Sequence, residues 1–167
     1  SRPNETIGQR DKKFTPYISV VQKGQSLHFS NQDDITHHIY SIGGENRFEF
    51  KLKSGEVKQT QYINSAEEIA MGCNIHDWMS GFVLVVDTPF YGKTNDAGSI
   101  SFTLPQEGDY DLTIWHPQLD VEGNQRTYSL DTESIGAARI YRVVLEKTML
   151  PIPEQKNQEE FEFLEEY

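Results

Sequence analysis

The sequence lacks several features that assign chains to common protein classes. It contains a single cysteine, so an internal disulfide scaffold is excluded. It has no apolar run of the ~20 residues that a membrane-spanning helix needs. It also has no basic excess, since 15 Lys and Arg stand against 26 Asp and Glu, a formal net charge of −11. An acidic chain repels phosphate backbones, so we expect no nucleic-acid partner.

Long stripes of apolar residues at helical spacing are absent as well, so we expect few helices. Several segments instead alternate polar and apolar residues, the pattern of half-buried strands. Strands are predicted at 17–21, 26–30, 39–42, 47–52, 82–86, 100–104 and 110–114. The continuous apolar run at 82–86 indicates a central strand covered on both faces. Many short strands separated by glycine-containing turns favour an all-β fold, a β-sandwich.

The distribution of chemically distinctive side chains changes near Asp87. Residues 8–87 contain nearly all the chemically distinctive side chains and are predicted to form the main sandwich. Residues 88–150 are predicted to form a small antiparallel β extension packed on it. Within this extension we expect a hairpin of 99–104 with 109–115 and a late strand near 139–146.

Residues 151–167 are predicted to be an acidic C-terminal tail, because six Glu and one Lys lie between 154 and 167. A tail of this composition is typically solvated. Phe161, Phe163 and Leu164 leave the alternative that it docks on a partner or on its own domain.

A Cys-x2-His-x2-Met motif lies immediately before the apolar strand. Cys73, His76 and Met79 fall within seven residues, and a short loop between two strands can turn all three side chains towards one point. Thiolate, imidazole and thioether are soft donors that favour copper over calcium or magnesium. A fourth donor must come from elsewhere in the chain, and the pair His37 and His38 supplies it.

These residues resemble the cupredoxins, the blue copper proteins of the plastocyanin and amicyanin type. The match consists of the segment from Asn31 to His37 followed by the Cys73 motif, whose short loop looks most like that of amicyanin. Residues 14–16 and 86–89 look like the bacterial plastocyanin-like proteins associated with methylamine utilisation. The resemblance covers roughly residues 8–119.

The resemblance implies a Greek-key cupredoxin sandwich that holds one type 1 copper ion, cycling between Cu(I) and Cu(II). His37, Cys73 and His76 would form the trigonal plane, and Met79 would be the long axial ligand. It further implies a one-electron carrier rather than an enzyme, located in the periplasm. The partner would be a redox protein, such as a c-type cytochrome or an oxidoreductase.

By the same resemblance, His76 would reach the surface through an apolar patch that serves as the electron port. Acidic residues near it could steer a basic partner, with a rate that falls as salt rises. Asp33, Asp34 and Asp77 are the candidate charges.

His38 marks a departure from the family pattern, because an Asn follows the first ligand histidine in plastocyanins and amicyanins. A ligand register that uses His38 therefore stays open. The spacing from Asn31 favours His37, and alternation along a strand sends His37 and His38 to opposite faces.

The remaining candidates have ordinary interpretations. His28 is interpreted as an outward-facing or hydrogen-bonded strand residue and Met71 as part of the core. His116 is interpreted as a strand-end residue, with a second metal site as the alternative.

Other functions stay open beside electron transfer. A copper-binding or copper-tolerance protein that buffers or delivers the metal would use the same ligands. A Cys–His nucleophile pair would leave His37 and Met79 without a role. A β-sandwich interaction module would work through residues 94–119, which resemble the transthyretin-like extensions found near bacterial cupredoxins.

Overall fold

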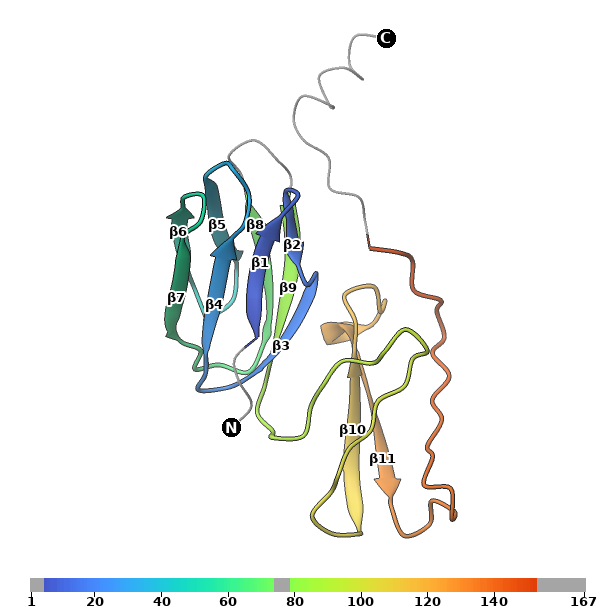
Figure 1. Cartoon of the computed structure of the whole chain (residues 1–167). Coiled ribbons are helices and arrows are strands. Elements are labelled where there is room, and N and C mark those ends of the chain that lie inside the picture. The colour runs from blue at the N-terminus through green and yellow to red at the C-terminus, as the bar shows by residue number, and fades with distance from the viewer. Residues whose placement is uncertain (1–4, 74–78, 153–167) are drawn as a thin grey trace, which may run out of the picture. The chain divides into compact units, whose positions relative to one another are not determined.

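The computed structural model describes residues 5–73 and 79–152 (Figure 1). Within these ranges it contains eleven strands and one short 3₁₀ helix, so the predicted all-β fold is confirmed. No helix in the described part of the chain is long and apolar enough to cross a membrane. The chain divides into two compact units, the first ending at Ile100 and the second beginning at Ser101.

The first unit is a sandwich of two sheets. One sheet has the strand order β2 (Lys13–Thr15), β1 (Thr6–Arg10), β4 (Ser26–Asn31) and β7 (Val57–Tyr62). The other has the order β3 (Ile18–Gln22), β9 (Met79–Val86), β8 (Glu68–Cys73), β5 (His37–Ile42) and β6 (Glu49–Leu52). The chain crosses between the sheets from β2 to β3, from β3 to β4, from β4 to β5, from β6 to β7 and from β7 to β8, as in a Greek-key sandwich (Figure 1).

The hydrophobic core lies between these two sheets. Both sheets contribute buried side chains at alternate positions, among them Leu27, Phe29, Ile39, Ile69 and Val83. Removing this apolar surface from water is the main favourable term in folding. Where one face of a strand is committed to the core, as in β4, β5, β8 and β9, its register is fixed.

The apolar run predicted to be central lies in β9, between β3 and β8. Val83 and Val85 point into the core and are buried, whereas Phe82, Leu84 and Val86 on the other face are half-buried. The central position is therefore confirmed, and the outer face is covered only in part.

The second unit contains a hairpin, but its second strand differs from the prediction. β10 (Asp109–Trp115) pairs with β11 (Gln125–Asp131), which follows the 3₁₀ helix η1 (Glu122–Asn124). The predicted pairing of 99–104 with 109–115 is wrong, and so is the strand near 139–146, since neither segment is a strand in the described chain. The boundaries predicted at 87 and 150, and the packing of the extension, stay predictions.

Two features explain the different pairing. Pro105 directly follows residue 104 and cannot donate a hydrogen bond to a ladder. β11 also alternates, and its half-buried Tyr128 and Leu130 lie opposite Leu112 and Tyr110. These cross-strand pairs are the contacts that stabilise a hairpin.

The Glu67 carboxylate anchors the loop between β5 and β6. Its Oε1 accepts hydrogen bonds from the backbone N–H and the side-chain amide of Asn46, both at 2.8 Å, and the backbone N–H of Glu45 donates to it at 3.1 Å. Burial raises the pKa of Glu67, but these hydrogen bonds and the charge of Arg47 together lower it below the ordinary value of 4.5.

We expect Glu67→Ala to lower the free energy of unfolding by roughly 1–3 kcal/mol at neutral pH, because charge-assisted hydrogen bonds are lost. A carboxyl group whose pKa is lower in the folded state stabilises the fold fully above its unfolded pKa. That contribution disappears as the pH falls through the folded-state pKa. Urea unfolding of both proteins from pH 7 downwards should therefore show a difference that shrinks below the ordinary value of 4.5. A difference that is independent of pH would contradict this assignment.

Candidate metal centre

His37 and Cys73 lie side by side at one end of the sandwich core. His37 begins β5, Cys73 ends β8, and the ladder places Ile39 opposite Cys73. Residues two apart on a strand share a face, so His37 lies on the inward face, next to Ile39. The Nδ1 atom of His37 is 3.5 Å from the Sγ atom of Cys73. The two residues are only 1% and 4% exposed.

Met79 joins this pair through the neighbouring strand. It begins β9 directly opposite Cys73 in the β8–β9 ladder and is 3% exposed. Directly opposite residues present their side chains on the same face of a sheet. Three of the four predicted ligands, His37, Cys73 and Met79, therefore come together at one end of the core. The fourth, His76, lies outside the described residues.

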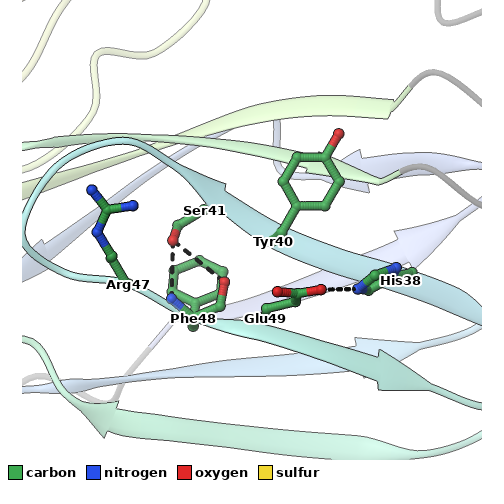
Figure 2. A pocket seen from close by; sticks show the side chains of 6 residues that line it. All are labelled: His38, Tyr40, Ser41, Arg47, Phe48 and Glu49. Atoms are coloured by element: carbon green, nitrogen blue, oxygen red, sulfur yellow. Dashed lines mark hydrogen bonds and ion pairs between the residues drawn. The ribbon is translucent and has the colours of Figure 1, made fainter.

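His38 points to the opposite face of β5, as strand alternation predicts. Its Nε2 lies 2.7 Å from the Oε1 atom of Glu49, and the side chain is partly exposed (Figure 2). Figure 2 shows it in a surface pocket whose lining residues are His38, Tyr40, Ser41, Arg47, Phe48 and Glu49. It is thus His37, and not His38, that faces Cys73.

The second ring nitrogen of His37 is held by Asp33. The Nε2 atom lies 2.7 Å from Asp33 Oδ2, and the Asp33 side chain is only 10% exposed. A carboxylate only accepts hydrogen bonds, so Nε2 is the nitrogen that carries the proton when the ring is neutral, and Nδ1, which then has a free lone pair, faces Cys73. The interpretation of Asp33 as a charge for steering a partner is therefore corrected. Of the other two candidates, Asp34 is exposed, and Asp77 lies outside the described residues.

The loop that carries Asp33 is fixed by the buried side chain of Asn31. The amide nitrogen of Asn31 donates to the carbonyl oxygens of Ile35 at 2.7 Å and Leu52 at 2.9 Å. Its Oδ1 accepts the backbone N–H of Asp33 at 3.0 Å. The segment from Asn31 to His37, whose spacing favours His37 as the ligand, is thus a loop held together by the side chain of Asn31.

Tyr40 packs over the strand beside Cys73. It lies opposite Gly72 in the β5–β8 ladder, and a Cβ atom on Gly72 would be 2.7 Å from the Tyr40 ring. A larger side chain at residue 72 would push the ring away, so with glycine there the ring covers the outer side of the backbone that leads into Cys73.

The other interpreted residues lie where the sequence predicts. His28 lies in β4 with Nε2 3.4 Å from Ser26 Oγ, and Met71 is buried in the core. His116 follows β10, where its Nδ1 accepts the backbone N–H of Gln118 at 3.0 Å, and burial lowers its pKa. Across residues 5–73 and 79–152, no group of three or more His, Cys, Asp or Glu side chains could hold a metal ion. A complete donor set therefore needs Met79 and the predicted His76.

The donor pair fits a transition-metal ion. Bonds of about 2.3 Å to sulfur and about 2.0 Å to nitrogen at a tetrahedral angle place the two donor atoms about 3.5 Å apart. The distance between Cys73 Sγ and His37 Nδ1 is 3.5 Å. Thiolate, thioether and imidazole donors select soft or borderline metals rather than calcium or magnesium.

Several solved structures similar to this chain are copper proteins. A Cu-containing nitrite reductase from Thermus scotoductus SA-01 is 22% identical, with a TM-score of 0.48 over 53% of this chain and 23% of its own. A purple cupredoxin from Nitrosopumilus maritimus is 19% identical, with a TM-score of 0.45 over 50% of this chain and 100% of its own. An amicyanin mutant in its reduced Cu(I) form at pH 4 is 17% identical, with a TM-score of 0.45 over 52% of this chain and 85% of its own.

Each of these similarities concerns the fold alone and extends over about half of this chain. This chain spans less than a quarter of the nitrite reductase chain. No family model and no curated protein matches the sequence.

We expect Asn31→Ala to lower the free energy of unfolding by roughly 2–4 kcal/mol, because two carbonyl groups and one N–H group lose their buried partner. Urea unfolding monitored by fluorescence measures the loss. Gln32→Ala, at the exposed neighbouring position, is the matched control and should change stability by less than about 0.5 kcal/mol. Equal effects of the two substitutions would contradict the role given to Asn31.

Proposed function

We propose that this chain is a mononuclear type 1 copper protein that carries single electrons between redox partners. The observation that carries the proposal is the buried contact between His37 Nδ1 and Cys73 Sγ at 3.5 Å, with Met79 opposite Cys73. His76, three residues after Cys73 and outside the described residues, is the predicted second imidazole. Two imidazoles, a thiolate and a weak axial thioether are the donor set of blue copper sites.

Cys73, His37 and Asp33 each have a defined role in this proposal. Cys73 supplies a thiolate, since metal binding deprotonates a coordinating thiol. His37 supplies Nδ1 because Asp33 holds the proton on Nε2, an arrangement that fixes the orientation of a ligand ring. Bound copper would supply a one-electron change between Cu(I) and Cu(II). No substrate bond changes, so the proposed protein is a carrier and not an enzyme.

The burial of the donors favours a carrier over a protein that delivers copper. His37, Cys73 and Met79 lie on packed strands, and each is at most 4% exposed. Side chains locked by packing keep one geometry, so the site needs little rearrangement when an electron arrives or leaves. A delivery protein must instead present its donors to an incoming acceptor.

Partner and location follow from charge and from the family resemblance. A net charge of −11 favours a basic redox partner, such as a c-type cytochrome or an oxidoreductase with a basic docking face. We place the protein in the periplasm on the resemblance to cupredoxins.

We expect one equivalent of Cu(II), added to the metal-free protein, to produce an intense blue or green absorption band and a narrow copper hyperfine splitting. Both signals come from the bond between Cys73 and copper, so Cys73→Ser should abolish them completely. Visible and EPR spectra measure this. A pale complex with ordinary splitting in the unmodified protein would contradict the type 1 site. Loss of copper during repeated reduction and oxidation would favour the delivery function instead.

His37→Gln and His38→Gln form a matched pair on the same strand. We expect His37→Gln to weaken Cu(II) binding by more than about 100-fold, the upper range for losing a residue that only orients a ligand. His38→Gln should leave the affinity within about twofold, because His38 lies on the other face of β5. Competition titrations with a copper chelator measure both. The reverse ranking would assign the ligand to His38.

A further inference from the structure

The turn between β1 and β2 has an unusual backbone. Arg10 pairs with Lys13, so the loop consists of Asp11 and Lys12 alone. Both residues have positive φ, 53° and 58°, which defines a type I′ turn. Such turns favour Asn-Gly or Gly-Gly, whereas a lysine in the left-handed region costs free energy.

The turn directs a backbone N–H group at the carboxylate that holds His37. The Lys12 N–H donates to Asp33 Oδ2 at 3.0 Å, and this same oxygen lies 2.7 Å from His37 Nε2. The Asp33 backbone is held separately, because its N–H donates to Asn31 Oδ1 and its carbonyl accepts the Ser54 hydroxyl at 2.6 Å. Asn31 and Ser54 thus fix the backbone of Asp33, and Lys12 fixes the carboxylate.

A continuous set of contacts therefore runs from the turn to the metal centre. It begins at the Lys12 N–H, passes through Asp33 Oδ2 and the His37 ring, and ends at Cys73 Sγ. A carboxylate that accepts the N–H of a ligand imidazole fixes its tautomer and makes the other nitrogen a stronger donor. A stronger donor beside a negative charge stabilises Cu(II) more than Cu(I), because Cu(II) carries one more positive charge.

We propose that the Asp11–Lys12 turn is a positioning device for the ligand histidine. It holds the Asp33 carboxylate against Nε2 of His37, which keeps Nδ1 free for the metal and lowers the reduction potential of the bound ion. The effect on the potential rests on the copper function proposed above, whereas the effect on the His37 tautomer does not.

Two turn variants test the role of the Lys12 N–H. Asp11→Gly combined with Lys12→Ser favours a type II′ turn, which has glycine at its first central position. Conversion from type I′ to type II′ flips the peptide between residues 11 and 12, so its N–H group points away from Asp33. Asp11→Asn is the matched control, because asparagine is favoured in type I′ turns and leaves that peptide in place. Asp33→Asn removes the carboxylate charge with little change in shape.

The first measurement is ¹⁵N NMR of the histidine rings in the metal-free protein. We expect the His37 Nε2 proton to exchange with water at least tenfold faster in Asp33→Asn and in the type II′ variant. The Asp11→Asn variant should keep the exchange rate of the unmodified protein. Unchanged exchange in both test variants, with only a loss of stability in urea, would make the turn merely structural and overturn the proposal.

The second measurement is the reduction potential of the copper-loaded proteins. A carboxylate that orients a ligand contributes 10- to 100-fold to metal affinity. If Asp33→Asn weakens Cu(II) binding tenfold relative to Cu(I), the potential rises by about 59 mV. The type II′ variant should raise it by less, and Asp11→Asn should leave it unchanged. A potential that is the same in all variants would overturn the effect on the metal.

The two measurements separate the two proposals. Absence of a type 1 spectrum in the unmodified protein would refute the copper function and with it the claim about potential. The NMR result would then still decide whether the turn positions His37.

Discussion

The structure depends on burying two polar groups, the His37 imidazole and the Cys73 thiol, inside a hydrophobic core. Burial of an unpartnered polar group is costly, so the ring must find partners on both nitrogens. Asp33 meets Nε2 and Cys73 faces Nδ1. Asn31 holds the backbone of Asp33, and the Lys12 N–H holds its carboxylate, so both keep the partner of Nε2 in place. At the proposed metal centre, the buried polar groups thus have polar partners inside the core. These contacts leave Nδ1 of His37 facing the sulfur of Cys73.

Neighbouring strands of one sheet place these groups side by side. Ile39, Cys73 and Met79 lie in register across β5, β8 and β9, so the position of one strand fixes the next. Packing against the opposite sheet then holds the row in a single geometry. A rigid and buried donor set suits repeated electron transfer better than metal exchange, which is the physical ground for preferring a carrier.

Much of this arrangement could be predicted from the sequence, because alternation along a strand is a local property. It separates His37 from His38 and locates β5, β6 and β9. Asp33 could not be identified in this way, since its partner Lys12 comes from a turn 21 residues earlier and the sequence shows no sign of the contact. β7 carries few apolar residues and is an edge strand, so the periodicity that predicts core strands is weak there. Two alternating segments, 99–104 and 125–131, are candidate partners for β10. The local pattern does not decide between them.

X-ray absorption at the copper edge of the loaded protein is the decisive measurement, because it reports the atoms bound to the metal rather than a consequence of binding. We expect one short bond to sulfur, from Cys73, and two bonds to imidazole nitrogen, with Met79 contributing at most a long and weak sulfur contact. Metal ligands made only of nitrogen and oxygen, with no short sulfur bond, would contradict the type 1 site.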